Sequence, residues 1–389
     1  MNRTLIPSLA AALAAAIALL ALGIQGCAPG ENLSLASAAE SLHGPPAARA
    51  FTFRYEATIA GVPENAKTVF LWLPFPPDTE DQTVRSMHID APFPYETVTE
   101  PRYGNRALRF EVPPGTKRAT VVVSVEIERR ERIRRPGQAR SKRGSDPAPA
   151  ALAAPGNGVP GESRATIEAL APERWLESDR LIPVDETIRA WAQESVGEAE
   201  TDIQKVRAIY DYAIENLKYD KRGDGWGRGD IYWACDAKRG NCTDFHALVI
   251  GYSRALGIPA RFEMGFPVPP DRGEGEIDGY HCWAQLYVQG HGWLPVDASQ
   301  AFKYPERREY FFGAHDENRI LFTYGRDLSF PGMEGEPLNY VIYPYAEVDG
   351  RSHEDLEKRF SYRDLESSPA RAEGRATPLA PSPAQRAPS

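Results

Sequence analysis

Three short stretches in the first third of the chain alternate hydrophobic and polar residues with the period of two that is typical of half-buried β-strands. They lie at residues 51–57, 68–73 and 119–127, and turns rich in Pro and Gly separate them. The pattern predicts that residues 51–133 form a small all-β sandwich. His88 stands alone there among surface-like residues, so we expect it to be solvated or hydrogen-bonded rather than a ligand.

The hydrophobic period changes to that of α-helices in the middle of the chain. Residues 202–217 carry apolar side chains at helical spacing behind a Thr201 cap, and a second helix is predicted from Cys242 to Gly257, with Pro259 just beyond its end. Strands are predicted after it at residues 260–268, 280–288 and 293–297. Helices followed by strands predict an α+β domain after the sandwich.

Two segments lack the hydrophobic residues that a packed core requires. Residues 134–165 are first basic and then rich in Pro, Ala and Gly, and the last residues repeat a Pro/Ala/Ser composition. The predicted organisation is therefore a signal peptide at 1–26, a tether at 27–50, the sandwich at 51–133, a disordered linker at 134–165, the α+β domain at 166–330, a C-terminal β extension at 331–366 and a disordered tail at 367–389.

The first residues have the layout of a secretory signal. A short polar start is followed by an apolar stretch over residues 5–23 and by small residues that end at Cys27. The junction at residues 24–27 resembles a bacterial lipoprotein signal, which implies lipidation of Cys27. A plain signal peptide cut near Cys27 and an uncleaved anchor of marginal length are the alternatives. All three place the rest of the chain outside the cytoplasm, and we expect a lipid-anchored protein of the periplasm or cell envelope.

Composition and charge narrow the possible partners. The chain has 389 residues, a formal net charge of −9 and a pI near 5.5, so it presents no basic face for nucleic acid or for an anionic membrane surface. We therefore expect no nucleic-acid partner and membrane contact only through the N-terminal lipid anchor. The cysteines, Cys27, Cys235, Cys242 and Cys282, are too few for a disulfide framework. A single bridge between Cys235 and Cys282 stays open.

Cys242 is the first candidate for chemistry. It follows Gly240 and Asn241 at the first turn of a predicted helix, where free backbone N–H groups and the helix dipole favour a thiolate. The same N–H groups could stabilise the oxyanion that forms when a thiolate attacks a carbonyl. A buried, inert cysteine is the alternative.

A histidine and an aspartate are predicted to meet beside it. The strands at residues 280–288 and 293–297 flank a turn at Gly290, and folding this hairpin brings His281 and Asp297 within a residue or two of being opposite. A carboxylate beside a histidine fixes the tautomer of the ring and supports the imidazolium, as an activated nucleophile requires. A register slip of one residue would separate them, and the sequence leaves that open.

Four sequence blocks together resemble the transglutaminase-like superfamily. They are RGNCTDFH at residues 239–246, RALGIPAR at 254–261, GYHCWAQ at 279–285 and GWLPVD at 292–297. The resemblance covers residues 200–300 closely and implies a papain-like α+β domain, preceded here by the all-β sandwich. It also implies that Cys242 is the nucleophile, His281 the base and Asp297 the acid that orients the base.

Other side chains near these residues have more than one interpretation. His246 shares a helical face with Cys242, so it is a rival base, a zinc ligand with Cys235 or Cys282, or a packing residue, and we favour the last. Cys282 alternates with His281 and is expected to be structural. The family may also use an oxyanion-hole side chain upstream of the cysteine, for which Tyr219, Trp226 and Trp233 are all candidates. The acidic loop at residues 271–278 is a lid or a solvated connection, and we favour the connection.

The predicted activity is acyl transfer through a thioester. Cys242 would attack an amide of a protein or peptide substrate, and water as acceptor makes the protein a peptidase or amidase, which we favour, whereas a lysine acceptor makes it a cross-linking transglutaminase. We expect no cofactor and no metal, calcium included. The alternative of another class is a non-catalytic envelope binding module, and a role in assembling an envelope system is a third possibility. Oligomeric state is not predicted.

Overall fold

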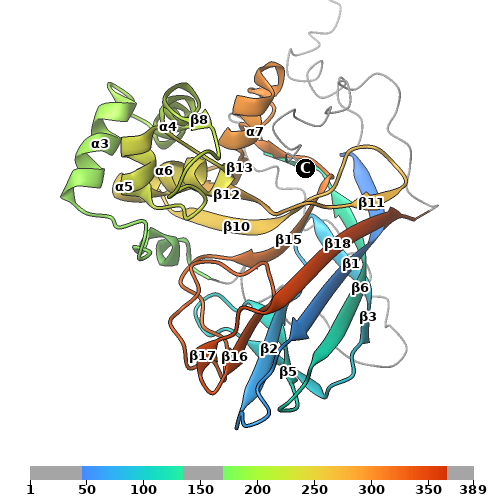
Figure 1. The fold of residues 1–389 in the computed structure, drawn as a ribbon. Coiled ribbons are helices and arrows are strands. Elements are labelled where there is room, and N and C mark those ends of the chain that lie inside the picture. Colours follow the sequence, from blue (N-terminus) through green and yellow to red (C-terminus); the bar gives the residue numbers. More distant parts are fainter. Residues whose placement is uncertain (1–45, 135–169, 366–389) are drawn as a thin grey trace, which may run out of the picture. The chain divides into compact units, whose positions relative to one another are not determined.

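The computed structural model describes residues 46–134 and 170–365, whose helices and strands are drawn in Figure 1. Several predictions fall outside these residues: the signal peptide, the lipidation residue Cys27, all of the linker except Arg134, and the tail. Of the predicted tether only residues 46–50 are described, and the first strand begins there at Ala48.

Two five-stranded sheets contain the strands of the predicted sandwich. The first has the order β11 (Glu274–Glu276), β18 (Leu356–Asp364), β1 (Ala48–Ala60), β6 (Arg118–Arg130) and β3 (Gln82–Asp90). The second has the order β17 (Arg351–Ser352), β16 (Tyr345–Val348), β2 (Val69–Pro74), β5 (Arg106–Glu111) and β4 (Tyr95–Thr99).

Strand β1 shows why this part of the chain forms sheets. Its side chains alternate between the core and solvent: Phe53 and Tyr55 are buried, whereas Arg54 between them is exposed. Buried side chains from both sheets belong to one hydrophobic cluster, which continues into the helical part of the chain.

The end of the described chain returns to these sheets. β18 pairs antiparallel with β1 along nine residues, from Phe51 opposite Asp364 to Ile59 opposite Leu356, and β16 pairs with β2. Both N-terminal strands therefore have one neighbour that comes from after residue 340. The predicted C-terminal β extension thus contributes strands to the N-terminal sheets, as the red β18 beside the blue β1 shows in Figure 1.

The helical part of the chain surrounds a four-stranded antiparallel sheet. Its order is β13 (Gly292–Val296), β12 (His281–Val288), β10 (Ala260–Pro267) and β15 (Arg319–Tyr324). The helices are α3 (Glu186–Val196), α4 (Asp202–Asn216), α5 (Ile231–Ala237), α6 (Cys242–Ala255) and α7 (Ala298–Lys303), with 3-10 turns at Pro172–Leu176 and Pro305–Arg307. Two short pairings, β7 (Arg132–Ile133) with β14 (Ala314–His315) and β8 (Lys218–Tyr219) with β9 (Arg239–Gly240), complete it.

Helix α6 is the centre of this part. Every one of its side chains from Cys242 to Ala255 is buried, and it contacts β12 on one side and α3, α4, α5 and α7 on others. Because its polar side chains are buried as well, they need hydrogen-bond partners inside the protein. The predicted helices at 202–217 and from Cys242, and the predicted strands after them, are confirmed with ends shifted by no more than two residues.

Two side-chain amides attach the four-stranded sheet to the sandwich. Gln82 accepts from the N–H of Leu321 at 2.8 Å and donates to its carbonyl at 2.9 Å, and Asn105 makes the same pair of bonds to Tyr324. Each amide therefore replaces a neighbouring strand along the outer edge of β15. The backbone N–H and C=O groups of Leu321 and Tyr324 on this edge are therefore paired. These bonds attach the sheet that carries His281 to the sandwich.

The predicted α+β class, with β-sheets before a core of helices around a four-stranded sheet, is confirmed. The loop at residues 271–278 differs from both interpretations of it, because residues 274–276 form β11 and pair with β18 at the rim of the first sheet. Within the described residues, no helix has both the length and the apolar character needed to span a membrane.

Candidate active site

Cys242 is the first residue of α6 and lies at a tightly built helix start. Asn241 caps the helix by accepting from the N–H of Thr243 at 2.8 Å, and the carboxylate of Asp244 accepts from the N–H of Asn241 at 2.9 Å. Gly240 precedes them with φ +153°, and a Cβ there would overlap Asp244. Cys242 is 2% exposed. The local sequence therefore places one thiol at the capped start of a buried helix.

The hairpin of β12 and β13 brings the other two predicted residues together. Ala284 is opposite Val296, so Asp297 is level with Trp283, two residues from His281 and on the same face of the sheet. The Nε2 of His281 lies 2.7 Å from the Oδ2 of Asp297, and both residues are buried. The register that the sequence left open is the one that allows this contact.

Asp297 is held by more than the histidine. Its Oδ1 accepts from the N–H of Gln300 at 3.0 Å and from the hydroxyl of Ser299 at 3.1 Å, which makes Asp297 the cap of α7. Its Oδ2 also accepts from Arg319 at 3.2 Å. Burial alone would raise the pKa of Asp297, but His281, Arg319 and His246 together hold it well below its usual value.

Arg319 was not found from the sequence. It lies on β15, 22 residues after Asp297 in the chain, and it is 2% exposed. Its guanidinium contacts Asp316 at 3.3 Å as well as Asp297, so one buried cation neutralises two buried carboxylates. An arginine within an otherwise ordinary strand pattern carries no sequence signal of this role.

Cys242 and His281 contact each other and change each other's protonation. Burial raises the pKa of the Cys242 thiol, but hydrogen bonds from Cys282 and His281 and the positive charges of His281 and Lys303 outweigh it and hold the pKa well below its ordinary value. Burial lowers the pKa of His281, but Asp297 and Cys242 raise it overall. Because Nε2 of His281 is bonded to Asp297, Nδ1 is the ring nitrogen left for the thiol. The pair therefore favours a thiolate beside an imidazolium.

Of the three candidates for an oxyanion-hole side chain, Tyr219 is the one beside Cys242. The backbone N–H of Cys242 donates a hydrogen bond to the hydroxyl of Tyr219, whose pKa burial raises well above its usual value. Trp226 instead lies near the ammonium of Lys221, and Trp233 packs over Gly225. The hydroxyl hydrogen of Tyr219 is thus a donor beside Cys242.

His246 and Cys282 are buried next to Cys242. The Nδ1 of His246 lies 2.8 Å from the carbonyl oxygen of Cys242, and burial lowers the pKa of the ring, so His246 is a neutral packing residue rather than a rival base. Cys282 is adjacent to Cys242, which together with burial raises the pKa of the Cys282 thiol well above its usual value.

Neither a disulfide nor a metal centre is formed by these side chains. Cys235, Cys242 and Cys282 are all free, so the Cys235–Cys282 bridge that the sequence left open is absent. Within residues 46–134 and 170–365, no group of three or more His, Cys, Asp and Glu side chains is arranged to hold a metal ion.

Asp244 also shapes the glycine-rich loop in front of the site. Its two oxygens accept from the N–H groups of Gly227 at 2.7 Å and Gly229 at 3.0 Å, in addition to Asn241. On the other side, the hydroxyl of Tyr280 bonds Asn241 at 2.9 Å. An acidic residue three positions after a helix cap is a recognisable sequence signal, whereas its contact with the loop is not.

Asp244→Asn tests this support through the pH dependence of stability. Burial raises the pKa of the Asp244 carboxyl to about 6, above its value in the unfolded chain. The carboxyl therefore contributes its full stabilisation to the folded state at low pH, and this contribution is lost as pH rises through 6. An amide nitrogen cannot accept, so at least one loop N–H loses its partner, at about 1–3 kcal/mol. In urea unfolding, we expect the variant to be less stable near pH 4 and the difference to narrow up to pH 6. A difference independent of pH would contradict this.

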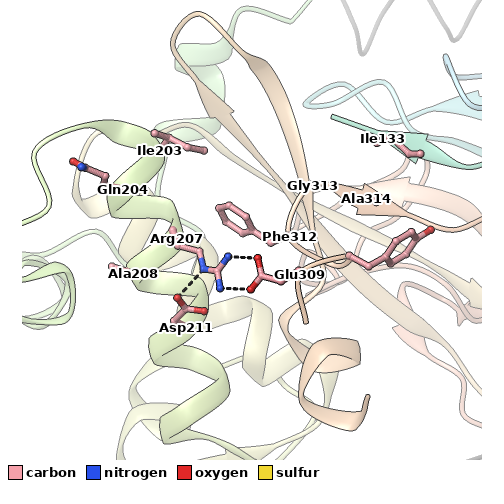
Figure 2. A pocket seen from close by; sticks show the side chains of 11 residues that line it. Ile133, Ile203, Gln204, Arg207, Ala208, Asp211, Glu309, Phe312, Gly313 and Ala314 are labelled. Carbon is pink, nitrogen blue, oxygen red and sulfur yellow. Dashed lines mark hydrogen bonds and ion pairs between the residues drawn. The ribbon is translucent and has the colours of Figure 1, made fainter. Parts of the chain in front are cut away.

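A cavity of about 890 Å³ lies elsewhere, between α4 and the residues around β14 (Figure 2). None of Cys242, His281 and Asp297 lines it. Its one guanidinium, that of Arg207, is bonded to both oxygens of Glu309 and to Asp211. The cavity therefore has room for a ligand but no free nucleophile, and the candidate chemistry stays at Cys242.

Comparison with known proteins gives this cluster a context. Residues 189–298 match the model of the transglutaminase-like superfamily, and Cys242, His281 and Asp297 all lie within that match. An uncharacterized protein of Haemophilus influenzae is 25% identical over 327 residues, which span 75% of this chain and 84% of the relative. The uncharacterized protein YebA of Bacillus subtilis is 22% identical over 150 residues, which span 34% of this chain and 20% of that protein.

A solved structure shares the fold. The crystal structure of a “Putative Cysteine Protease” from Cytophaga hutchinsonii is similar over 85% of this chain and 94% of that one, with a TM-score of 0.52 and 16% identity. Residues 189–298 thus match the transglutaminase-like superfamily model, within a fold that the Cytophaga hutchinsonii protein shares.

Proposed function

We propose that the protein is a cysteine hydrolase that cleaves amide bonds of proteins or peptides, with Cys242 as nucleophile, His281 as base and Asp297 as the residue that orients the base. The observation that carries the proposal is the continuous contact from Cys242 through His281 to Asp297, at a helix start in a buried site. The superfamily match over the same residues supports it.

The first half of the reaction forms a thioester. The thiolate of Cys242 attacks the carbonyl carbon of the substrate amide, and the negative charge that moves to the oxygen is stabilised by the Tyr219 hydroxyl. The imidazolium of His281 then gives its proton to the departing nitrogen. The C–N bond breaks, the amine leaves, and His281 is neutral again.

The second half returns the enzyme to its starting state. A water molecule loses a proton to His281 and adds to the thioester carbonyl, after which the C–S bond breaks and releases the acid and the Cys242 thiolate. The negative charge of Asp297 stabilises the imidazolium in both halves. An amine in place of water would give a transferred amide by the same steps, so the acceptor alone separates hydrolase from transglutaminase.

The test reads the protonation of Cys242 directly. Residues 28–389 are treated with limiting iodoacetamide across a pH series, and each cysteine is followed by mass spectrometry. We expect Cys242 to react with a midpoint well below the reference thiol pKa of about 8.5, because the imidazolium stabilises its thiolate. Cys235 and Cys282, whose pKa values burial raises, serve as internal controls.

His281→Ala separates a catalytic pair from a merely acidic thiol. The variant should move the Cys242 midpoint upwards, and wild-type protein should cleave members of a quenched-fluorescent peptide library that the variant leaves intact. Adding a labelled primary amine distinguishes transfer from hydrolysis. If Cys242 reacts no faster than Cys235, the proposal fails and a non-catalytic binding module becomes the better account.

We also propose that the protein acts in the periplasm or cell envelope, held there by a lipid on Cys27. The proposal is supported by the N-terminal signal layout alone. Radiolabelled palmitate incorporated into wild-type protein but not into Cys27→Ala would support it, and equal labelling of both would refute it.

A further inference from the structure

A lysine beside the nucleophile has no ion-pair partner among the residues that the structure describes. Lys303 is the last residue of α7, the helix that Asp297 caps, and its Nζ is 3.8 Å from the centre of the Tyr219 ring. The hydroxyl of the same tyrosine accepts from the backbone N–H of Cys242. One aromatic ring therefore separates the ammonium group from the point where a substrate carbonyl would bind.

The charge of Lys303 acts on the site. Burial lowers the pKa of Lys303, while Cys242 and Asp297 raise it, and Lys303 in turn contributes to the low pKa of Cys242. The side chain is half-buried, so its ammonium has lost part of its hydration. No ion pair joins it to a carboxylate in the described parts of the chain. A substrate anion would supply that missing partner.

A second lysine extends the positive charge to the rim. The Nζ of Lys221 lies 5.9 Å from the centre of the Tyr219 ring and 5.8 Å from that of Trp226, and it too has no ion pair among residues 46–134 and 170–365. The neighbouring carboxylate of Asp220 is bonded to Arg222 at 2.8 Å. Its charge is therefore largely compensated before it could neutralise either lysine.

We propose that Lys303, with Lys221 at the rim, forms an anionic subsite beside Cys242, so that the preferred substrates are acidic peptides with a carboxylate close to the cleaved amide. This rests on the proposed function. The protein as a whole carries a net charge of −9, so its long-range electrostatic field repels an acidic peptide. The local lysines therefore have to provide the recognition.

The test compares two alkylating reagents that differ in charge. Iodoacetate and iodoacetamide share the leaving group and the reaction at sulfur, but only iodoacetate is an anion. The ratio of their rate constants at Cys242, at a pH where the thiolate is fully formed, measures anion recognition independently of the thiol pKa. We expect Lys303→Met to lower this ratio about threefold to tenfold, as one ammonium group in a partly solvated site implies.

Matched variants exclude indirect effects. Lys303→Arg keeps the charge and should keep the ratio, whereas Lys221→Met should lower it by less than Lys303→Met. Lys117→Met, an exposed lysine in the turn before β6, should leave it unchanged. The imidazolium of His281 also attracts iodoacetate, and it is present in every variant, so the comparison cancels it.

Each outcome has a distinct meaning. An unchanged ratio in Lys303→Met, with Cys242 still reactive towards both reagents, refutes the anionic subsite and leaves the proposed function standing. Loss of reactivity towards both reagents in the wild type refutes the proposed function itself. As a second measurement, kcat/KM for paired peptides with Glu or Gln beside the cleaved bond should favour Glu in the wild type, and Lys303→Met should reduce that preference by a similar factor.

Discussion

Cys242→Ala is expected to lower kcat on the best-cleaved library peptide by about 10⁴-fold or more, because no other described thiol can take its place. Cys282 is adjacent, but the pKa of its thiol is raised well above the usual value, and it follows His281 on β12 instead of lying at a helix start. The measurement is single-turnover cleavage, with circular dichroism to show that the fold persists.

Cys235→Ala provides the matched control for this result. Cys235 lies on α5, where its thiol contacts the hydroxyl of Tyr252 at 3.5 Å, and it has no contact with His281. Its removal should leave kcat unchanged. Turnover that survives in Cys242→Ala would show that another group is the nucleophile, and the mechanism above would be wrong at its first step.

Asp297→Ala is expected to destabilise the protein by about 3–5 kcal/mol, because it leaves the guanidinium of Arg319 buried with only one carboxylate. It also removes the partner of His281 Nε2, so the pKa of His281 should fall and that of the Cys242 thiol should rise. Urea unfolding measures the first effect, and the iodoacetamide pH profile measures the second.

Arg319→Met separates the structural role of Asp297 from its effect on the histidine. Alone, it removes the guanidinium that the buried carboxylates of Asp297 and Asp316 share, so it should also be destabilising. Combined with Asp297→Ala, the total cost should be smaller than the sum of the two, because the unpaired charges are removed together. Additive losses would mean that the 3.2 Å contact between Asp297 and Arg319 contributes no coupling.

The parts of the site that could be predicted are those that depend on residues close together in the sequence. The helix start is defined by Asn241 and Cys242, which are followed three residues later by a helical apolar pattern. The hairpin that carries His281 and Asp297 is defined by a turn centred on glycine. These elements depend on neighbours within about 20 residues. The structure places them as the local patterns predict, while their chemical roles stay proposals.

What could not be predicted depends on contacts between distant residues. Tyr219 could not be chosen over two tryptophans, because its position at Cys242 follows from the parallel pairing of β8 with β9. Arg319 and Lys303 have no motif and acquire their roles from packing alone. Residues 274–276 read as a solvated acidic loop because the strand they pair with, β18, lies about 85 residues later in the chain.

The pairing of β18 with β1 has a consequence for how the protein is made. A sheet whose second and third strands are separated by almost 300 residues of chain has a very high contact order, and such sheets close slowly. During synthesis or export from the N-terminus, β1 emerges long before β18, so one of its edges stays bare until the last described residues arrive. β11, which four residues separate from His281, also pairs with β18. Closure of this edge of β1 and pairing of the segment just before His281 therefore both wait for the same strand, β18.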